Sequence, residues 1–505
     1  MTVVNTNVAA LAAQTSMFKN TRELEDAMAK LSSGHRINTA ADDAAGLSIA
    51  DRLDSQIRGL SQAIRNAQDG QNLIDTVEGA SAETVIALQR LRELAVQAST
   101  DTNSSVDRSF LQKEANQLLS EINRIGSSTQ WNGMNVLDGS FVNKAIQVGA
   151  NISDIIQVGI NDIQAQGIGN HVIRGHSQDV SVGNDALTNL IAAGTTVIAG
   201  FAGVASVVTT AGDSAREFAA DVNNLASKSG VTADARTNLM ISSVSGDGVV
   251  QIDIGKQGQV VESGGNVNGL SAVQINATVK TTDLTGLRNA INNVSGETGV
   301  TASFFNGDTA RLMLTDLDGD DIVLSDFGHS TSGGTINAQA YDFFGTSVAS
   351  GSSVENLTDG GTDSTTASGT VTLSSSQGFT VRDPHSTGYF GAPSFAVSSL
   401  DSVGDIDIGT VAGAQRALEV LDGAISMVNN QRSDLGAISN RLDNTISNLT
   451  NIVENTTASK SHIKDANFAA ETSKLTKAQI LNQAATSMLA QANASKQQML
   501  ALINS

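Results

Sequence analysis

The stretch VAGAQRALEVLDGAISMVNNQRSDLGAISNRLDNTISNLTNIV, residues 411–453, decides the fold. Thirteen positions in it follow one another at alternating steps of three and four residues, and eleven of them are apolar. They are Val411, Ala414, Leu418, Leu421, Ile425, Val428, Arg432, Leu435, Ser439, Leu442, Ile446, Leu449 and Val453. This spacing is typical of a helix that packs lengthwise on other helices. Such a helix would be roughly 65 Å long, so it needs partners along its length.

A second long helix is expected after Asp42 or Asp43, either of which can cap its first free N–H groups. Its apolar residues also follow steps of three and four, slip by one residue near Val77, and continue to Ala98. We predict a coiled-coil core of Leu53, Ile57, Leu60, Ile64, Leu418, Leu421, Ile425, Val428, Leu435, Leu442, Ile446 and Leu449. Packing within one chain explains this seam at least as well as packing between chains. We expect the later helix to break near Asn455-Thr456-Thr457.

The two ends of the chain carry further seams. Residues 1–33 hold one that shifts phase between Phe18 and Leu24, and a glycine at 34 is the expected helix stop. Residues 460–505 hold another, in which small and large residues alternate. We predict self-assembly seams at Val4, Val8, Leu11, Phe18, Leu481, Ala485, Met488, Ala492, Met499 and Leu502. Two paired helices with so few aromatic residues leave apolar surface uncovered, and such surface marks an interaction site. Contacts between identical subunits that do not close give helical filaments.

The middle of the chain has a different composition. Residues 176–400, called the insert below, contain 22 acidic and 8 basic residues and many Gly, Ser and Thr. A repeat predicts two α+β modules at about 213–254 and 283–327, each a short helix, a strand led by Gly-Val-Thr-Ala, a second strand, a turn and another strand. Before the insert, Ile146–Gly149 and Ile156–Gly159 indicate a β-hairpin. We therefore expect a mostly α fold at the two ends, with long antiparallel coiled-coil helices from the N- and C-terminal segments plus a β-hairpin, and an inserted α+β or β-rich outer region.

Composition and missing motifs exclude several classes of function. The chain has 505 residues, a net charge of −21 and no cysteine, so nucleic acid is not an expected partner and thiolate chemistry is excluded. No apolar run is long enough to span a membrane. The six histidines lack metal-ligand spacing, and there is neither a GxSxG motif nor a P-loop. We predict no enzyme activity, no cofactor and no metal.

One acidic segment and the N-terminus also call for interpretation. Residues 316–321 loosely match a calcium loop but lack its closing glutamate, so a hairpin turn between Leu314 and Ile322 is the better interpretation. The first residues lack the basic region and cleavage site of a secretory signal. The protein is therefore expected to stay in the cytoplasm or to leave by a route without a cleaved signal.

Three motifs then carry a family resemblance. LSSGHRIN (31–38) followed by ADDAAGL (41–47) resembles the N-terminal signature of bacterial flagellin. LQRLRELAVQ (88–97) is similar to the helix of that family that an innate-immune receptor recognises, and MLAQAN (488–493) resembles its C-terminal motif. The resemblance covers about 1–175 and 401–505, while the insert matches only through its repeat.

The resemblance implies a structural subunit that polymerises into the flagellar filament for swimming, outside the cell, after export in an unfolded state through the flagellum's own channel. Three domains are implied: 1–42 with 457–505 in the filament core, 43–175 with 401–456 as a surrounding coiled-coil domain, and 176–400 as the variable surface. The alternative is a hook–filament junction or surface-adhesive protein built on the same terminal helices. An enzyme within the insert is the weakest option.

The resemblance also implies partners. These are other copies of the chain, an export chaperone that binds the C-terminal helix, and the cap and junction proteins of the flagellum. A vertebrate Toll-like receptor is a further implied partner, through Arg90, Leu94 and Glu114. Alternatively, Arg90 and Glu114 form an ordinary ion pair between helices or between subunits, and an ion pair is compatible with a receptor contact.

Overall fold

The computed structural model describes residues 6–176, 180–183, 189–256, 272–349, 352–361, 363–385, 388–391 and 394–503. They form two compact units, Met1–Asp75 with Asn143–Val158 and Leu435–Ser505, and Thr76–Val142 with Gly159–Asp434. The helices are α1 (Val8–Ser33), α2 (Ala44–Ala98), α3 (Ser105–Ser128), α4 (Ala215–Asn224), α5 (Ala226–Ser229), α6 (Thr285–Asn293), α7 (Ser295–Thr298), α8 (Val411–Lys464) and α9 (Phe468–Ile503), with a 3-10 turn η1 (Val403–Asp405). The division into three domains stays a prediction.

The strands form antiparallel sheets. Two short hairpins are β1 (Gln130–Trp131) with β2 (Met134–Asn135) and β3 (Lys144–Gln147) with β4 (Ile155–Val158). An eight-stranded sheet joins β12 (Thr301–Phe305), β13 (Asp308–Asp316), β9 (Thr232–Ser242), β18 (Thr370–Ser375), β5 (Gly169–Arg174) and β21 (Ser399–Ser402), with β15 (Thr335–Ala340) and β16 (Glu355–Thr358) branching from β9. A five-stranded sheet has the order β11 (Val273–Val279), β10 (Gly248–Lys256), β14 (Ile322–His329), β17 (Ser364–Ala367) and β6 (Ser181–Gly183). A four-stranded sheet has the order β20 (Ala396–Val397), β19 (Thr380–Arg382), β7 (Gly194–Gly200) and β8 (Gly203–Thr209).

The first helix ends, and the second begins, where the sequence predicts. Gly34 follows α1 with a φ of 73°, a left-handed conformation that glycine adopts at little cost. The side chain of Asp43 accepts a hydrogen bond of 2.8 Å from the N–H of Gly46, so Asp43 caps α2. The hairpin of β3 and β4 is also confirmed, although its strands are displaced by one or two residues toward the N-terminus.

The expected break at Asn455-Thr456-Thr457 is wrong. Helix α8 continues to Lys464, and the chain turns only at residues 465–467. Tertiary contacts carry the helix through this polar segment: Ile452 and Val453 pack against Leu60 and Ala63 of α2, and Lys460 forms an ion pair with Asp54. The helix then ends where the loop after α1 can pair with it, since the N–H of Arg36 donates to the carbonyl of Lys464 at 2.7 Å.

Two hydrophobic cores organise the insert. One lies between the five-stranded sheet, α6 and the strands β9, β13 and β15, and the other is built on α4, β18 and the four-stranded sheet. The long strand β9 serves both, because Ala233 and Ala235 enter the second core while Leu239 and Ile241 enter the first. The strand of the first repeat copy thus joins two packing layers, so this copy is not an isolated module.

The repeat is real at its helical start and differs afterwards. The side-chain amides of Asn223 and Asn292 each bind both backbone groups of one residue, Ala233 and Ala302 respectively, at 2.7–2.9 Å. The first copy continues as one uninterrupted strand, β9, so the two strands predicted there are wrong. The second copy does form two strands, β12 and β13, because Asn306 and Gly307 both adopt positive φ and make a tight turn.

The turn at residues 317–321 also differs from its prediction. It is not a hairpin, since β13 pairs with β9 and β12, whereas β14 pairs with β10 and β17 in another sheet. A tight Asp-Gly turn fits a hairpin and a crossover between sheets equally well in the sequence. Among the described residues, no helix combines the length and the apolar character that crossing a membrane requires.

Candidate assembly surfaces

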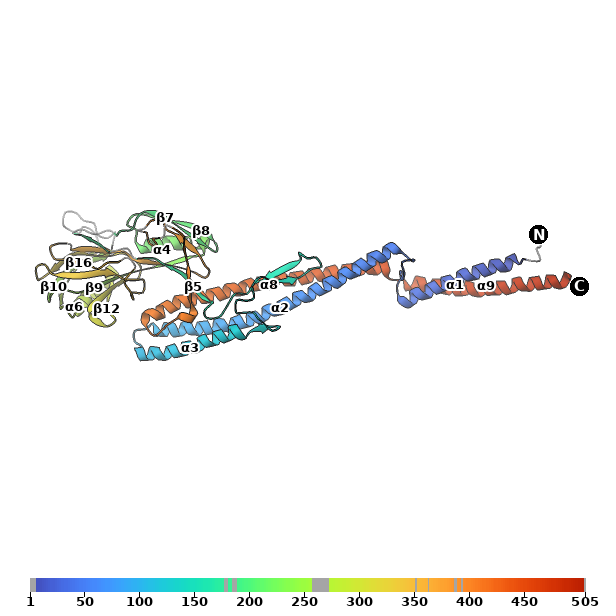
Figure 1. The fold of residues 1–505 in the computed structure, drawn as a ribbon, viewed down its shortest axis with the longest axis horizontal. Coiled ribbons are helices and arrows are strands. Elements are labelled where there is room, and N and C mark those ends of the chain that lie inside the picture. The colour runs from blue at the N-terminus through green and yellow to red at the C-terminus, as the bar shows by residue number, and fades with distance from the viewer. Residues whose placement is uncertain are drawn as a thin grey trace. The chain divides into compact units, whose positions relative to one another are not determined.

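Helices α1 and α9 lie side by side (Figure 1) and pack through small residues. Two polar contacts fix the register of this antiparallel pair: Asn7 donates to the carbonyl of Ala492 at 3.1 Å, and Asn482 donates to Thr21 at 3.1 Å. The residues of α9 turned toward α1 are spaced by three and four and are at least half-buried: Glu471, Leu475, Ala478, Asn482, Ala485, Leu489 and Ala492. On α1 the corresponding series is Ala10, Ala13, Met17, Asn20, Leu24, Ala27 and Leu31. Many of these residues are alanines, which allow the two backbones to approach closely.

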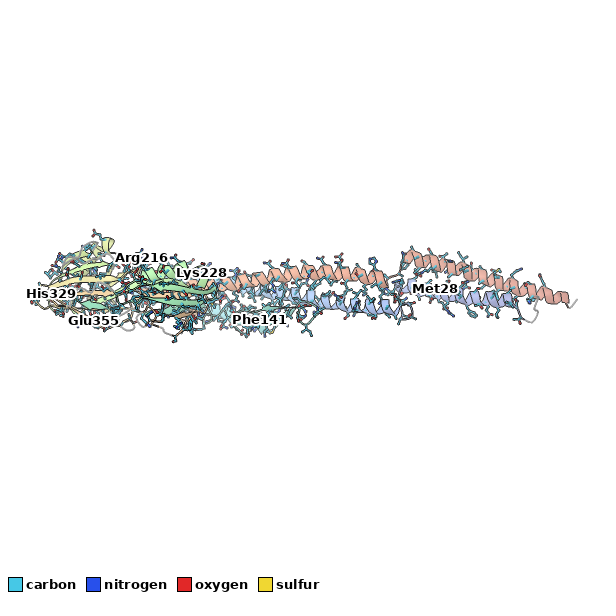
Figure 2. All side chains as sticks on the ribbon, turned by 90° about the horizontal axis from the view of Figure 1, so that it is seen from above. Met28, Phe141, Arg216, Lys228, His329 and Glu355 are labelled. Atoms are coloured by element: carbon cyan, nitrogen blue, oxygen red, sulfur yellow. The ribbon has the colours of Figure 1, made fainter. Side chains whose placement is uncertain are left out.

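Several large apolar side chains of this pair point outward, although others, such as Leu24 and Leu489, lie in the inner series. Val8, Leu11 and Phe18 on α1 are 64%, 61% and 59% exposed, and Met28 is also exposed (Figure 2). On α9, Met488 is 65% exposed, and Phe468, Ile480 and Leu481 line a shallow groove. A helix pair that served only the monomer would place its large residues inside and its small ones anywhere. This pair instead leaves Val8, Leu11, Phe18 and Met488 exposed to water.

The predicted seam residues therefore divide between the two faces. Val8, Leu11, Phe18, Leu481 and Met488 lie on the exposed face, whereas Ala485 is buried and Ala492 half-buried toward α1. After the phase shift that follows Phe18, Leu24 and Leu31 lie on the inner face, whereas Met28 stays exposed. Val4 and the side chains of Met499 and Leu502 lie outside the described residues. Sequence reasoning missed Phe468 and Ile480, because neither continues the series that was followed on α9.

The predicted coiled-coil core occupies the inside of the α2 and α8 packing. Its buried members are Leu60, Leu421, Val428, Leu435, Leu442 and Leu449, and its half-buried members are Leu53, Ile57, Ile64, Leu418, Ile425 and Ile446. Five of the buried residues recur every seven positions from 421 to 449, which is a single heptad position. At the polar seam position 432, the arginine binds Glu78 through two nitrogens at 2.6 and 2.9 Å. The seam is thus filled within one chain.

The three residues implied in receptor recognition have different environments. Arg90 and Glu114 form an ion pair between α2 and α3, in which Nε and Nη2 of the arginine donate to one carboxylate oxygen at 3.0 and 2.7 Å. Both side chains are nearly half exposed. Leu94 is only 1% exposed, so in this fold its side chain supports the helix from inside rather than offering a contact surface.

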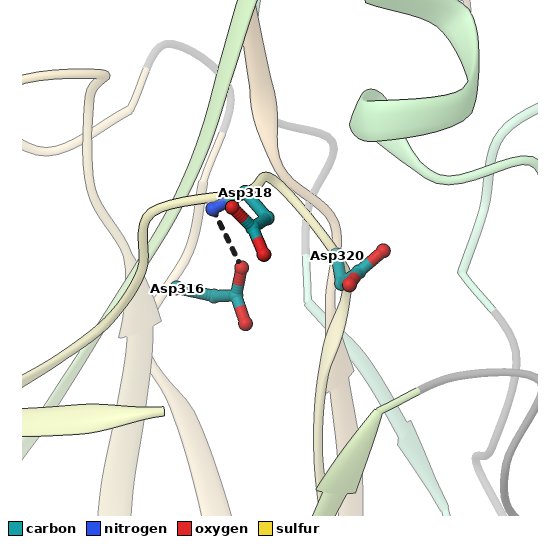
Figure 3. A group of neighbouring side chains, drawn as sticks. All are labelled: Asp316, Asp318 and Asp320. Carbon is teal, nitrogen blue, oxygen red and sulfur yellow. Dashed lines mark hydrogen bonds between the residues drawn. The ribbon is translucent and has the colours of Figure 1, made fainter. Parts of the chain in front are cut away.

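Three carboxylates gather in the turn after β13 (Figure 3). Oxygen atoms of Asp316, Asp318 and Asp320 lie within 4.8 Å of one another. The ammonium group of Lys256 binds Asp316 at 2.8 Å and Asp320 at 2.7 Å, and Arg216 reaches Asp320 at 2.9 Å. Burial opposes the charge on Lys256, but the two carboxylates outweigh that effect and raise its pKa. Side chains of this protein therefore supply positive charge to the cluster.

The next residue, Asp321, is completely buried. Burial raises its pKa to about 8, and the nearby charges of Asp320 and Glu217 act in the same direction. A hydrogen bond of 2.5 Å from the Asn189 amide opposes the shift without cancelling it. This carboxyl group is protonated near neutral pH, and it is a structural group rather than a member of any catalytic arrangement.

Three family descriptions match parts of this chain. The description "Bacterial flagellin N-terminal helical region" matches residues 4–142, "Bacterial flagellin C-terminal helical region" matches 418–503, and "Flagellin hook IN motif" matches 262–318. The last match covers much of the second repeat copy. Among solved structures, FliC from Burkholderia pseudomallei is 20% identical, with 74% of this chain and 99% of that chain covered and a TM-score of 0.30.

Two curated relatives match along nearly the whole chain. B-type flagellin of Pseudomonas aeruginosa is 37% identical over 99% of both proteins, and polar flagellin C of Vibrio parahaemolyticus is 33% identical over 97% of this chain and 96% of its own length. Matches of this extent include both helical ends and the insert. The chain therefore belongs to the bacterial flagellin family, whose members are structural subunits of the extracellular flagellar filament and not enzymes.

Proposed function

We propose that the exposed apolar faces of α1 and α9 are the contacts through which copies of this chain join into the filament. The observation that supports this proposal is the exposure of Val8, Leu11, Phe18 and Met488 on the outer side of the pair. A soluble monomer gains nothing from that arrangement, because exposing large apolar side chains to water is unfavourable. When neighbouring copies cover these side chains, their burial favours association.

The geometry favours an open polymer over a closed oligomer. Burying one exposed Leu, Ile, Val or Phe completely is worth about 1.5–3 kcal/mol, so several such residues per subunit hold a polymer without covalent links. Contacts between different faces of identical subunits extend without limit unless the rotation closes. The α2 and α8 seam is already filled within the chain, so it supplies stiffness and leaves the contacts to the ends.

A truncation separates the contacts made by the ends from the stiffness supplied by α2 and α8. Removing residues 481–505 takes away Leu481 and Met488 and leaves α2, α3, α8 and the insert intact. We expect a folded, soluble monomer that sediments as a single species and forms no filaments under conditions in which the full chain polymerises. The matched point variants are Met488→Gln, which should weaken polymerisation, and Ser487→Gln, which should not. Filaments formed by the truncated chain would refute the role of this helix.

The same exposed faces support two finer assignments. We infer that the C-terminal helix binds the export chaperone before assembly, because apolar residues such as Ile480 and Met488 need cover in the cytoplasm. The chain would leave by the flagellum's own channel, and the cap and junction proteins would contact the ends of the polymer. The alternative of a junction or adhesive protein has less support, since the relatives matched over nearly full length are named flagellins.

We also propose that Arg90 and Glu114 contact the innate-immune Toll-like receptor. Their ion pair presents a charged, half-exposed surface on two adjacent helices. Exposed ion pairs contribute little to stability, so this pair is available for a contact at little cost to the fold. Leu94, being buried, would act by holding the helix that carries Arg90.

A further inference from the structure

The four-stranded sheet of the insert has one covered face and one bare face. Ile198, Val207 and Val381 point into the core that contains α4. The strand pairing places Thr195 opposite Val208, Ala199 opposite Val204 and Thr380 opposite both Ala199 and Val397. Directly paired residues of an antiparallel sheet lie on one face, so these side chains share the side that faces away from the core.

The bare face carries five apolar residues and, beside them, the polar Thr195, Ser206, Thr380 and Arg382. Val204, Val208 and Val397 are 64%, 66% and 74% exposed, and Val197 and Ala199 fill the space between them. Phe201, at the turn between β7 and β8, and Phe395, just before β20, are exposed beside the same strands. Scattered apolar residues are ordinary on a protein surface, but three strongly exposed valines grouped on one face of a sheet, with two exposed phenylalanines beside its strands, indicate an interaction site.

The charge of the insert indicates what covers this face. Between residues 176 and 400 the chain has 22 acidic and 8 basic residues, so the inserts of neighbouring copies repel one another over most of their surface. The described positions on the bare face carry no acidic residue and one charged residue, Arg382. Two inserts can therefore approach closely here without bringing carboxylates together. A filament also holds copies of the chain at high local concentration, which favours even a weak contact.

We propose that this bare face, formed by Val197, Ala199, Val204, Val208, Thr380 and Val397, is a contact between the inserts of two copies of this chain. The same face of each copy takes part, which makes the contact self-complementary, and the two sheets pack face to face as in a β-sandwich. This inference rests on the filament function proposed above. It adds a second contact, in the insert, that does not involve α1 or α9.

The absence of cysteine from the chain allows a direct test. Three full-length variants each receive one cysteine on the bare face, Val204→Cys, Val208→Cys or Val397→Cys, and are assembled into filaments. The control is Leu317→Cys, which is 64% exposed in the turn after β13. Filaments are treated with a short bis-maleimide reagent, dissolved, and analysed for covalent dimers. Valine and cysteine are similar in size and the sites are exposed, so folding should be unaffected.

We expect covalent dimers from at least one of the three variants, at a yield at least fivefold above that of Leu317→Cys, and we expect Val204→Glu to remove most of the yield from Val208→Cys. Filaments that form normally and give no dimers above the control at all three positions would overturn this inference alone. Equal yields from the control would overturn it too. If the unmodified chain forms no filaments, the proposed function itself fails, and the two failures are thereby distinguished.

Discussion

Replacing Phe18 with alanine tests the assembly surface at one side chain. Phe18 is 59% exposed in the monomer. A phenylalanine buries about 150–250 Å² in all, so roughly 120 Å² remains for a neighbouring copy to cover. At about 25 cal/mol per Å² that area is worth about 3 kcal/mol. Because each 1.4 kcal/mol is a factor of about ten, Phe18→Ala should raise the subunit concentration in equilibrium with polymer roughly a hundredfold.

The monomer should be unaffected by this change. Alanine favours helix more than phenylalanine does, and Phe18 does not belong to the inner series that meets α9. The assay sediments polymer at equilibrium and measures the protein left in solution, and circular dichroism checks the helix content. Gln14→Ala, an exposed polar residue of the same helix, is the control and should leave the soluble concentration unchanged. A soluble concentration for Phe18→Ala within about threefold of the unmodified chain would refute the reasoning, since that corresponds to less than about 0.7 kcal/mol.

Two further predictions follow from other parts of the fold. The pKa of Asp321 rises from 3.8 to about 8 on folding, so the folded chain holds a proton there that the unfolded chain has released. The stability that this proton contributes is complete below about pH 4, and it is lost as the pH rises through 8, at about 1.4 kcal/mol of unfolding free energy per pH unit. Asp321→Asn should therefore remove this decrease from the unfolding free energy measured with urea between pH 5 and 8. An unchanged slope would contradict the assignment. Arg90→Ala should reduce signalling by the Toll-like receptor at least tenfold. It should change the free energy of unfolding by less than about 1 kcal/mol, because the ion pair is exposed. Undiminished signalling would exclude a contact at Arg90.

The helical ends could be predicted from sequence because their signals are local. Steps of three and four, the glycine at 34 and the aspartates at 42 and 43 each act within a few residues, and the structure has helices with those bounds. The break at Asn455-Thr456-Thr457 was wrong for a non-local reason. Polar and β-branched residues weaken a helix only slightly, and the packing of Ile452 and Val453 outweighs that effect.

The sequence does not predict which face of each terminal helix packs against the other helix of the same chain. On α9 the series that contains Leu481 and Met488 and the series that contains Leu475 and Leu489 have the same spacing. A hydrophobic pattern shows that a face will be covered, but not whether the same chain covers it. The sheets of the insert posed a related problem, because the partners of β13 and β14 lie far away in sequence and the turn between them reads the same in a hairpin and in a crossover.

The chain therefore uses one sequence pattern for two different purposes. From Leu421 to Leu449 every seventh residue is a large apolar one that is at most 6% exposed in the single chain, so this seam stabilises the monomer. In α1 and α9 several large residues, among them Phe18 and Met488, are left to water, and alanines share the inside with leucines that are only half-buried. The pair therefore gains less from its own packing than the seam of α2 and α8 does. We propose that neighbouring copies supply part of the free energy that stabilises the ends, so that growth of the filament also stabilises the folded ends.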